Sequence, residues 1–209
     1  LQLDRTERDM LDLVCSNFDN VIVVYNGANA MELGFINEYS QIKSAIWCPG
    51  TGQSGFEALG EIVAGTVNPS GKTSDTFVAD LTATPTWNNF GYFKYDNMDE
   101  YAYTSNNFKT GEEETALPSF VNYVDGIYVG YRFYETAAAE GLINYDDTVV
   151  YPFGYGLSYT TFTQEMGAIS EDNGTISFDV TVTNTGDVAG KDVVEVYYNP
   201  PYTLSLIHI

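Results

Sequence analysis

The sequence predicts an α/β fold: a parallel sheet covered by helices on both faces, followed by the first strands of a truncated antiparallel β-sandwich. Two observations predict it. In residues 1–79, short apolar runs alternate with stretches of helical period, an order typical of parallel sheets flanked by helices. Beyond residue 152 the hydrophobic period changes to two, which indicates strands that bury one face. We therefore expect an α/β sandwich domain at residues 1–150 and a second domain beginning at residues 151–203.

The first expected elements are a helix and a buried strand. Asp4 with Glu7 three positions later forms the signature of a capping box, and apolar residues follow at helical spacing. Residues 21–25, Val-Ile-Val-Val-Tyr, are a β-branched run that suits a strand buried on both faces. An Asn-Gly pair ends this strand, and residues 31–39 favour a short helix.

A second strand and helix follow the same pattern. Residues 44–48 are a short apolar run ended by Pro-Gly, and residues 55–64 place their apolar side chains on one helical face. The Asn-Pro-Ser-Gly sequence at 68–71 is a strong turn signal. A third strand is expected at residues 73–79.

The composition changes after residue 85. Residues 87–121 show no clear period, so we expect long loops packed by their own aromatic side chains. Such loops either shape a binding site or cover one flank of the sheet. Residues 126–134 predict another strand, and the Pro-Phe-Gly-Tyr-Gly sequence at 152–156 marks the boundary between the domains.

The second domain reads as antiparallel strands of an immunoglobulin or fibronectin type III architecture. Apolar residues alternate with polar ones at residues 176–183, and a further strand is expected at residues 193–198. So few strands cannot close a core, so we expect a truncated domain, in a chain that also looks cut before Leu1. Residues 204–209, Leu-Ser-Leu-Ile-His-Ile, resemble a translated sequencing-adapter repeat and are expected to be a non-native tail.

Charge and composition exclude several kinds of partner. With 29 acidic and 8 basic residues the formal net charge is -21, which repels phosphate backbones and anionic lipid and disfavours nucleic acid and membrane surfaces. No apolar run approaches the roughly 18 residues of a membrane span. Cys15 and Cys48 read as buried free thiols, and no metal site is expected because Cys-x-x-Cys and His-rich spacings are absent. The acidic surface would not repel a neutral sugar as it repels phosphate groups and anionic lipid.

Residues 50–55 match G-x-G-x-x-G between a predicted strand and a predicted helix. In that context the motif can bind the pyrophosphate of a dinucleotide at the helix N-terminus, with Asp80 on the ribose. Against this interpretation, the motif belongs to the second strand–helix unit, and the chain has few basic residues to support an anion.

Four blocks of residues follow one another along the chain. They read IWCPGTGQSGFEAL (46–59) with GTVNPSGK (65–72), DGIYVGYRFY (125–134), YPFGYGLSYTTF (151–162), and VTVTNTG (180–186) with GKDVVEVY (190–197). In this order they resemble glycoside hydrolase family 3, the β-glucosidase and β-xylosidase family. The match is to its C-terminal α/β sandwich and to the start of its fibronectin type III-like domain.

This resemblance implies a bacterial parent enzyme that releases sugars from the non-reducing ends of oligosaccharides or β-glycosides with retention and without a cofactor. Retention uses two carboxyl groups roughly 5 Å apart. In the family the nucleophile is an aspartate on a (β/α)8 barrel, and the acid/base is usually a glutamate preceding the part that begins here. No catalytic residue is therefore assigned in this chain, and the missing barrel is its expected partner.

What this segment can contribute is one wall of a sugar pocket. Ligands of open α/β sheets lie beyond the carboxyl ends of the strands, so Thr51, Gln53 and Ser54 are expected to face the barrel or bind sugar hydroxyls. Trp87 is a candidate for stacking on a sugar ring, whereas Trp47 is expected in the core. Four glutamates at helical spacing are expected to be solvated or capping: Glu32, Glu38, Glu57 and Glu61.

The sequence thus predicts a non-catalytic part of a retaining, β-glucosidase-like hydrolase, itself inactive. A carbohydrate-binding or adhesive module without catalysis is the alternative that the aromatic, acidic loops and the β-sandwich suggest. A dinucleotide-binding oxidoreductase domain is the third possibility, and it depends on the 50–55 motif alone.

Overall fold

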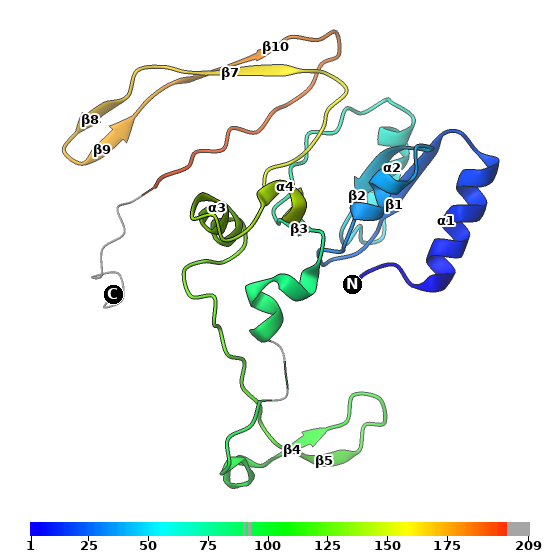
Figure 1. Cartoon of the computed structure of the whole chain (residues 1–209), viewed down its shortest axis with the longest axis vertical. Coiled ribbons are helices and arrows are strands. Elements are labelled where there is room, and N and C mark those ends of the chain that lie inside the picture. Colours follow the sequence, from blue (N-terminus) through cyan, green and yellow to red (C-terminus); the bar gives the residue numbers. More distant parts are fainter. Residues whose placement is uncertain (90, 92, 200–209) are drawn as a thin grey trace. The chain divides into compact units, whose positions relative to one another are not determined.

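A computed structural model describes residues 1–89, 91 and 93–199 of the chain (Figure 1). The predicted tail at residues 204–209 lies outside the described residues. Contacts divide the chain into two compact units. Unit 1 comprises Leu1–Ile46 and Asp75–Pro152, and unit 2 comprises Trp47–Ser74 and the residues from Phe153 onward. Each unit is described by itself.

Unit 1 begins with the predicted capped helix, α1 (Arg5–Asn17). The Asp4 carboxylate accepts a hydrogen bond from Glu7 N (2.8 Å), and the Glu7 carboxylate accepts one from Asp4 N (2.8 Å). Two backbone donors that have no partner within the helix are thereby satisfied, which confirms the capping box. Leu11 and Cys15 are the buried residues of α1. Cys15 forms no disulfide, as predicted, and neither does Cys48, which is half-buried.

Strands β1 (Val21–Tyr25) and β2 (Ile42–Trp47) pair with each other. They lie where the sequence predicts strands, and η1 (Gly34–Glu38), a 3-10 helix, takes the place of the expected short helix between them. The prediction that β1 is buried on both faces is wrong: Ile22 is 48% exposed and Val24 42%. Val24 borders an apolar groove of about 190 Å³ that is also lined by residues of α1, so packed side chains do not close this face.

The third strand is much shorter than the expected 73–79. Strand β3 (Phe77–Val78) pairs in the antiparallel direction with β6 (Val149–Tyr151). The segment is divided because Thr73 bonds elsewhere, its N donating to Tyr155 O (2.8 Å) within unit 2. This pairing departs from the predicted parallel sheet, since the third strand runs antiparallel to its neighbour in a two-stranded sheet.

The core of unit 1 gathers around β3. Phe77 and Val78 are each 1% exposed. Val78 clusters with Tyr134 and Val149, and partly buried side chains pack around them: Leu81, Phe133, Ile143 and Tyr145. These residues come from four separate stretches of the chain, so the core joins elements that are distant in sequence.

The strand predicted at residues 126–134 is wrong. The chain instead turns at Gly130, whose φ of +59° favours glycine, and enters helix α3 (Tyr131–Ala139). The run Thr-Ala-Ala-Ala favours a helix, and Tyr134 and Ala137, three residues apart, are its buried face. The four-residue α4 (Tyr145–Thr148) follows and leads into β6.

The aromatic segment 87–121 contains more regular structure than expected. The 3-10 helix η2 (Leu81–Ala83) precedes the segment, η3 (Pro85–Asn89) overlaps its start, and η4 (Met98–Tyr101) lies within it. Strands β4 (Tyr103–Asn106) and β5 (Glu113–Ala116) form an antiparallel hairpin. Aromatic packing is present as predicted: Phe120 stacks on Tyr95 with ring centroids 4.5 Å apart and lies 5.6 Å from Phe93.

Unit 2 contains α2 (Gly55–Val63), within one residue of the predicted helix, and four strands. Strand β7 (Phe162–Met166) pairs in the antiparallel direction with β10 (Val180–Asn184), and β8 (Ser170–Asp172) with β9 (Thr175–Ser177). The strand expected at residues 193–198 is absent from the described structure. The Val193 carbonyl accepts a side-chain bond from Gln164 (3.0 Å) rather than a bond of a strand ladder.

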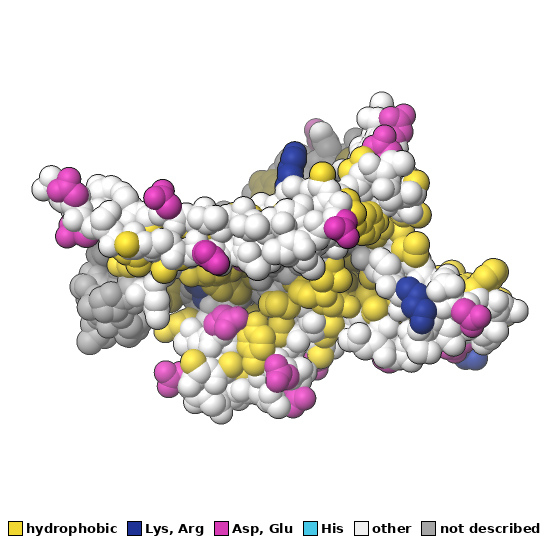
Figure 2. All heavy atoms as spheres, turned by 90° about the horizontal axis from the view of Figure 1, so that it is seen from above, with side chains coloured by type: hydrophobic (Ala, Val, Ile, Leu, Met, Phe, Trp, Pro, Cys, Tyr) yellow, Lys and Arg dark blue, Asp and Glu magenta, His cyan; other side chains and the backbone are white. Residues whose placement is uncertain are grey.

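Acidic side chains are spread over the face shown in Figure 2, with few basic ones among them. None of the helices in the described part of the chain combines the length and the hydrophobicity of a membrane span.

Candidate functional site

The 50–55 motif forms a turn that ends β2 and starts α2. Gly50 (φ +56°) and Gly52 (φ +63°) adopt left-handed conformations that disfavour other residues. A Cβ at either glycine would meet nothing within 4 Å, so the backbone conformation, not lack of space, requires glycine there. Gly55 N donates to Thr51 O (3.0 Å), which closes the turn onto the helix.

The three residues predicted to face a partner or a sugar are all in this turn. Thr51 is half-buried, and Gln53 and Ser54 are exposed. Ser54 occupies the N-cap position of α2, yet its side chain makes no capping hydrogen bond. The turn therefore presents polar side chains that the helix start does not use.

The dinucleotide interpretation gains no further feature from the structure. The residues of the 50–55 motif include no basic side chain. Asp80, the residue considered for the ribose, accepts hydrogen bonds from Thr82 N (2.8 Å) and Thr82 Oγ1 (2.6 Å) at the start of η2. These bonds lower the pKa of the Asp80 carboxyl, so its carboxylate is engaged as a local cap.

Two of the four glutamates set aside in the sequence have structural partners within unit 1. Glu32 accepts a hydrogen bond from Leu81 N (3.0 Å), and Glu38 pairs with Arg8 at 3.0 Å. Glu57 and Glu61 are exposed on α2. Their placement agrees with the predicted capping and solvated roles. Across residues 1–89, 91 and 93–199 no three acidic, histidine or cysteine side chains gather as a metal site would require.

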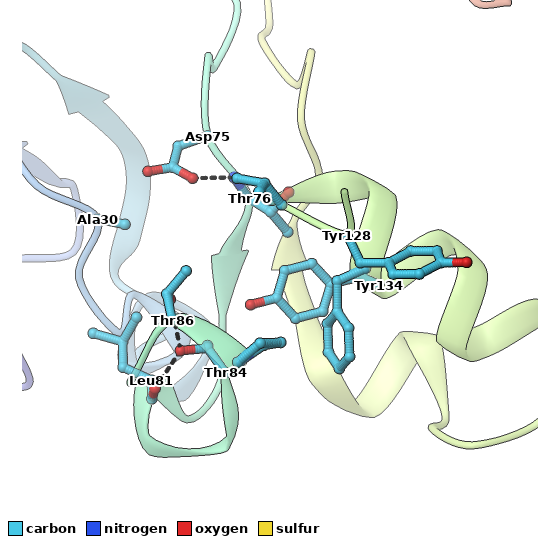
Figure 3. A pocket seen from close by; sticks show the side chains of 12 residues that line it. Ala30, Asp75, Thr76, Leu81, Thr84, Thr86, Tyr128 and Tyr134 are labelled. Atoms are coloured by element: carbon cyan, nitrogen blue, oxygen red, sulfur yellow. Dashed lines mark hydrogen bonds between the residues drawn. The ribbon is translucent and has the colours of Figure 1, made fainter. Parts of the chain in front are cut away.

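Trp87, the fourth candidate residue, lies in η3 of unit 1 and is 52% exposed. The residues just before it, Thr84 to Thr86, line a cavity of about 220 Å³ (Figure 3). Because Trp87 belongs to unit 1 and Thr51, Gln53 and Ser54 to unit 2, the four predicted residues do not form one site within either unit.

Four stretches of unit 1 supply the cavity walls, the first of them by Ala30 alone (Figure 3). Asp75 and Thr76 come from the segment before β3, Leu81 and residues 84–86 from η2 and η3, and an aromatic group from the start of α3. The aromatic group comprises Tyr128, Phe133 and Tyr134. A mostly apolar cavity with a few polar groups is the usual form of a small-molecule site.

The sequence alone does not predict this cavity. Asp75 and Thr76 fall within one predicted strand, and Tyr128 and Tyr134 within another. The one sequence feature that marks the site is the polar pair Asp75-Thr76, which comes immediately before the buried Phe77 and Val78. Only the folded structure brings this pair beside the aromatic residues.

A buried network supports one side of this region. Asn89 is 4% exposed and Asp125 8%. Asn89 Nδ2 donates to Asp125 Oδ1 (3.1 Å), and Asn89 Oδ1 accepts from Val124 N (3.0 Å). Since buried polar groups need such partners, this network fixes η3 against the segment that leads to Tyr128.

Tyr134, which lines the cavity, has an altered ionisation. Burial, with a smaller contribution from the negative charge of Asp75, raises the pKa of Tyr134 to about 12. Tyrosine in an unfolded chain ionises near 10, so the folded state holds this proton more tightly.

We expect the stability associated with Tyr134 to be complete below pH 10 and to be lost as the pH rises towards 12. In that window the unfolded state has released the proton while the folded state keeps it, which costs up to about 2–3 kcal/mol. Urea unfolding from pH 9 to 12 should show a steeper decline for the natural chain than for Tyr134→Phe. Parallel declines would contradict the assignment.

A family model, curated relatives and solved structures all relate the chain to the same family of glycosidases. Residues 1–159 match the model of the glycosyl hydrolase family 3 C-terminal domain. Beta-glucosidase A of Butyrivibrio fibrisolvens is 35% identical over 214 residues, covering 95% of this chain and 22% of that protein. An exo-alpha-(1->6)-L-arabinopyranosidase of Bifidobacterium breve is 30% identical over 201 residues, covering 96% of this chain and 22% of that protein.

Among solved structures, beta-glucosidase 3B from Thermotoga neapolitana in complex with glucose matches with a TM-score of 0.67 at 28% identity. The match covers 90% of this chain and 23% of that chain. A beta-glucosidase from Paenibacillus barengoltzii matches with a TM-score of 0.64 at 30% identity. These similarities confirm the predicted α/β fold class. The chain spans under a quarter of the length of these relatives.

Proposed function

Because this chain belongs to glycoside hydrolase family 3, through the family's C-terminal domain, we propose that the whole protein is a retaining β-glycosidase. It would release single sugars from the non-reducing ends of oligosaccharides or β-glycosides. The observation that carries the proposal is the match over residues 1–159 to a domain of glycosidases, with relatives named as β-glucosidases. Since one relative is an arabinopyranosidase, the proposal names a reaction class rather than one sugar.

We further propose that this chain alone hydrolyses nothing. A retaining mechanism needs a nucleophilic carboxylate and an acid/base carboxyl about 5 Å apart. Glu32 and Glu38 are engaged in structural contacts, and the resemblance assigns both catalytic groups to polypeptide outside residues 1–209. The nucleophile would lie on a (β/α)8 barrel.

Assays on the purified chain and on the product of the complete gene test both statements. We expect residues 1–203 to cleave a chromogenic β-glucoside at the background rate, and the complete protein to cleave it with retention at the anomeric carbon. Cleavage by the chain alone well above background would overturn the first statement. A complete gene that encodes no barrel would overturn the proposed hydrolase.

We propose that residues 1–150 act as the sandwich domain and that residues 151–203 begin the fibronectin type III-like domain. The end of the family match at residue 159 supports this division. Within the sandwich, the exposed Gln53 and Ser54, the half-buried Thr51 and the exposed Trp87 are proposed to face the barrel or the sugar.

In the complete protein, Trp87→Ala is expected to raise KM for a β-glucoside about threefold to tenfold, the effect of losing one ring contact. Gln53→Ala is expected to raise KM about fivefold through one lost hydrogen bond. Lys109→Ala, at an exposed position of the β4–β5 hairpin, serves as the control and should leave KM unchanged. Unchanged KM in both test variants would remove these residues from the pocket.

A carbohydrate-binding or adhesive module without catalysis is the second candidate. The hairpin of β4 and β5 favours it, because Phe108 at its turn is fully exposed and Tyr103 is 53% exposed. Exposed aromatic rings are suited to stacking on sugars. The complete gene again discriminates, since this candidate requires no barrel.

A further inference from the structure

Thr76, one of the residues that line the cavity of unit 1, carries a hydroxyl without a partner. Thr76 is 5% exposed, and its Oγ1 is buried with no hydrogen bond among the described residues. Buried polar groups in folded proteins are nearly always paired, because an unpaired one destabilises the fold. A buried threonine hydroxyl without a partner points to a group that the described residues do not supply.

Thr84 and Thr86 also line the cavity, and the direction of the hydrogen bond between their hydroxyls can be worked out. Thr84 Oγ1 lies 2.8 Å from Leu81 O and 3.1 Å from Thr86 Oγ1 (Figure 3). A threonine hydroxyl has one hydrogen, which Thr84 gives to the Leu81 carbonyl. Thr86 must then donate to Thr84, so Thr86 Oγ1 keeps a lone pair with which to accept a bond from a ligand.

Asp75 completes the polar set. One of its carboxylate oxygens accepts a hydrogen bond from Thr76 N (2.9 Å), which leaves acceptor capacity on a group that offers about four acceptor sites. The residues that line the cavity include no basic side chain. The residues around the cavity therefore include two acceptors, Asp75 and Thr86. They also include the phenolic hydroxyls of Tyr128 and Tyr134 and the buried hydroxyl of Thr76, each of which can donate or accept.

This combination selects a neutral ligand with several hydroxyl groups. An anion would be repelled by Asp75 and find no basic residue. Hydroxyls, in contrast, donate to a carboxylate and accept from a threonine. The rings of Tyr128, Phe133 and Tyr134 form an aromatic side of the cavity, and aromatic faces suit the C–H face of a sugar.

We propose that the unit 1 cavity, at about 220 Å³, binds one neutral sugar unit. Asp75 and Thr86 accept hydrogen bonds from its hydroxyls, and Thr76 supplies the remaining polar contact after a rotation about its Cα–Cβ bond. The choice of glucose as the probe rests on the proposed function. The binding itself requires no catalysis and is a property of this chain.

Titration of the purified chain with glucose, followed by amide NMR, tests the proposal. We expect saturable shifts in the millimolar range at the amides of Asp75, Thr76 and Thr86, and a rise in melting temperature that grows with glucose concentration. Absence of saturable shifts would overturn the proposal. So would equal shifts with ethylammonium, a cation that would identify an Asp75 charge site instead.

Two variants make the role of the hydroxyl falsifiable. Thr76→Val keeps the shape but removes the unpaired oxygen, so without glucose its urea midpoint should rise, while its glucose affinity should fall at least tenfold. Thr104→Val, an exposed residue of the β4 strand, is the matched control and should bind as the natural chain does. A Thr76→Val chain that is less stable, or binds glucose normally, would contradict the proposal.

This outcome is separable from the proposed hydrolase function. Binding is measured on the chain alone, whereas hydrolysis is measured on the product of the complete gene. A complete protein that cleaves β-glycosides, with a chain that binds no glucose, would overturn only the cavity proposal. A chain that binds glucose, with a complete gene that encodes no barrel, would overturn only the hydrolase proposal.

Discussion

Replacing Gly156 with alanine is expected to destabilise unit 2 by about 3 kcal/mol or more. A Cβ at this position would collide with the carbonyl oxygen of Gly71 and lie 2.9 Å from Lys72 Cδ. The close approach is held by hydrogen bonds on both sides: Lys72 Nζ donates to Gly156 O (2.6 Å), and Thr73 N donates to Tyr155 O (2.8 Å). A backbone oxygen cannot rotate away as a side chain can, so the two segments must separate.

The measurement is urea unfolding together with hydrogen exchange of the amides at residues 73 and 154–155, whose bonds lie beside the collision. Gly60→Ala is the matched control, since Gly60 is in the interior of α2 and its added Cβ would meet nothing within 4 Å. That control should gain up to about 1 kcal/mol from helix propensity. A Gly156→Ala chain as stable as the natural one would show that the two segments do not make this contact.

The successful predictions share one property, which is that the signal and the structure are local. The capping box of Asp4 and Glu7 and the helix after the 50–55 turn involve residues within a few positions of one another. Hydrogen bonds to groups three or four residues away follow from the sequence itself. Tertiary packing reinforces such elements but does not choose them.

The failed predictions involve segments whose partners are distant. Residues 126–134 carry the β-branched and aromatic composition of a strand, yet Tyr134 is buried against Val78 and Val149 from the face of a helix. Residues 193–198 have the same composition and form no strand in the described structure. Whether either segment forms a strand depends on whether another strand lies beside it, because strand propensity mainly measures packing against neighbouring strands.

The candidate site shows the same division. The left-handed glycines of the 50–55 turn follow from their sequence pattern, and the structure has them. The unit 1 cavity could not be predicted, because Asp75, Thr86 and Tyr128 meet only when β3, η3 and the start of α3 are assembled. The unpaired state of the Thr76 hydroxyl depends on all three segments and has no counterpart in the sequence.

Replacing Asn68 with alanine is expected to cost about 2–3 kcal/mol, because one side chain ties three distant groups together. Asn68 Oδ1 accepts bonds from Ser158 Oγ (2.9 Å) and Tyr159 N (2.8 Å), and Asn68 Nδ2 donates to Ala189 O (3.0 Å). All of these groups belong to unit 2, and the sequence separations are 90, 91 and 121 residues. The amide therefore fixes the 68–71 turn both to residues 158–159 and to the loop that follows β10.

Two further variants separate this role from a general loss of polar contacts. Asn107→Ala also removes three side-chain hydrogen bonds, but they reach only Lys109, Thr110 and Glu114 within one hairpin. It should change the urea midpoint little, since local opening of the hairpin relieves it. Asn68→Asp keeps the two accepted bonds and loses the donated one, so its loss should be intermediate at pH 7. The loss of stability of Asn68→Asp relative to the natural chain should be smaller at pH 4, where a protonated carboxyl can donate to the Ala189 carbonyl.

The relative sizes of the shifts in urea midpoint distinguish an amide that links distant segments from an ordinary surface amide. If Asn68→Ala and Asn107→Ala shift the urea midpoint equally, the three distant bonds add nothing beyond local ones, and the assigned role of Asn68 is wrong. If Asn68→Ala has the larger effect and Asn68→Asp recovers part of it on acidification, the donated bond to Ala189 is present. In that case one amide group holds the 68–71 turn against residues 158–159 and 189 within unit 2.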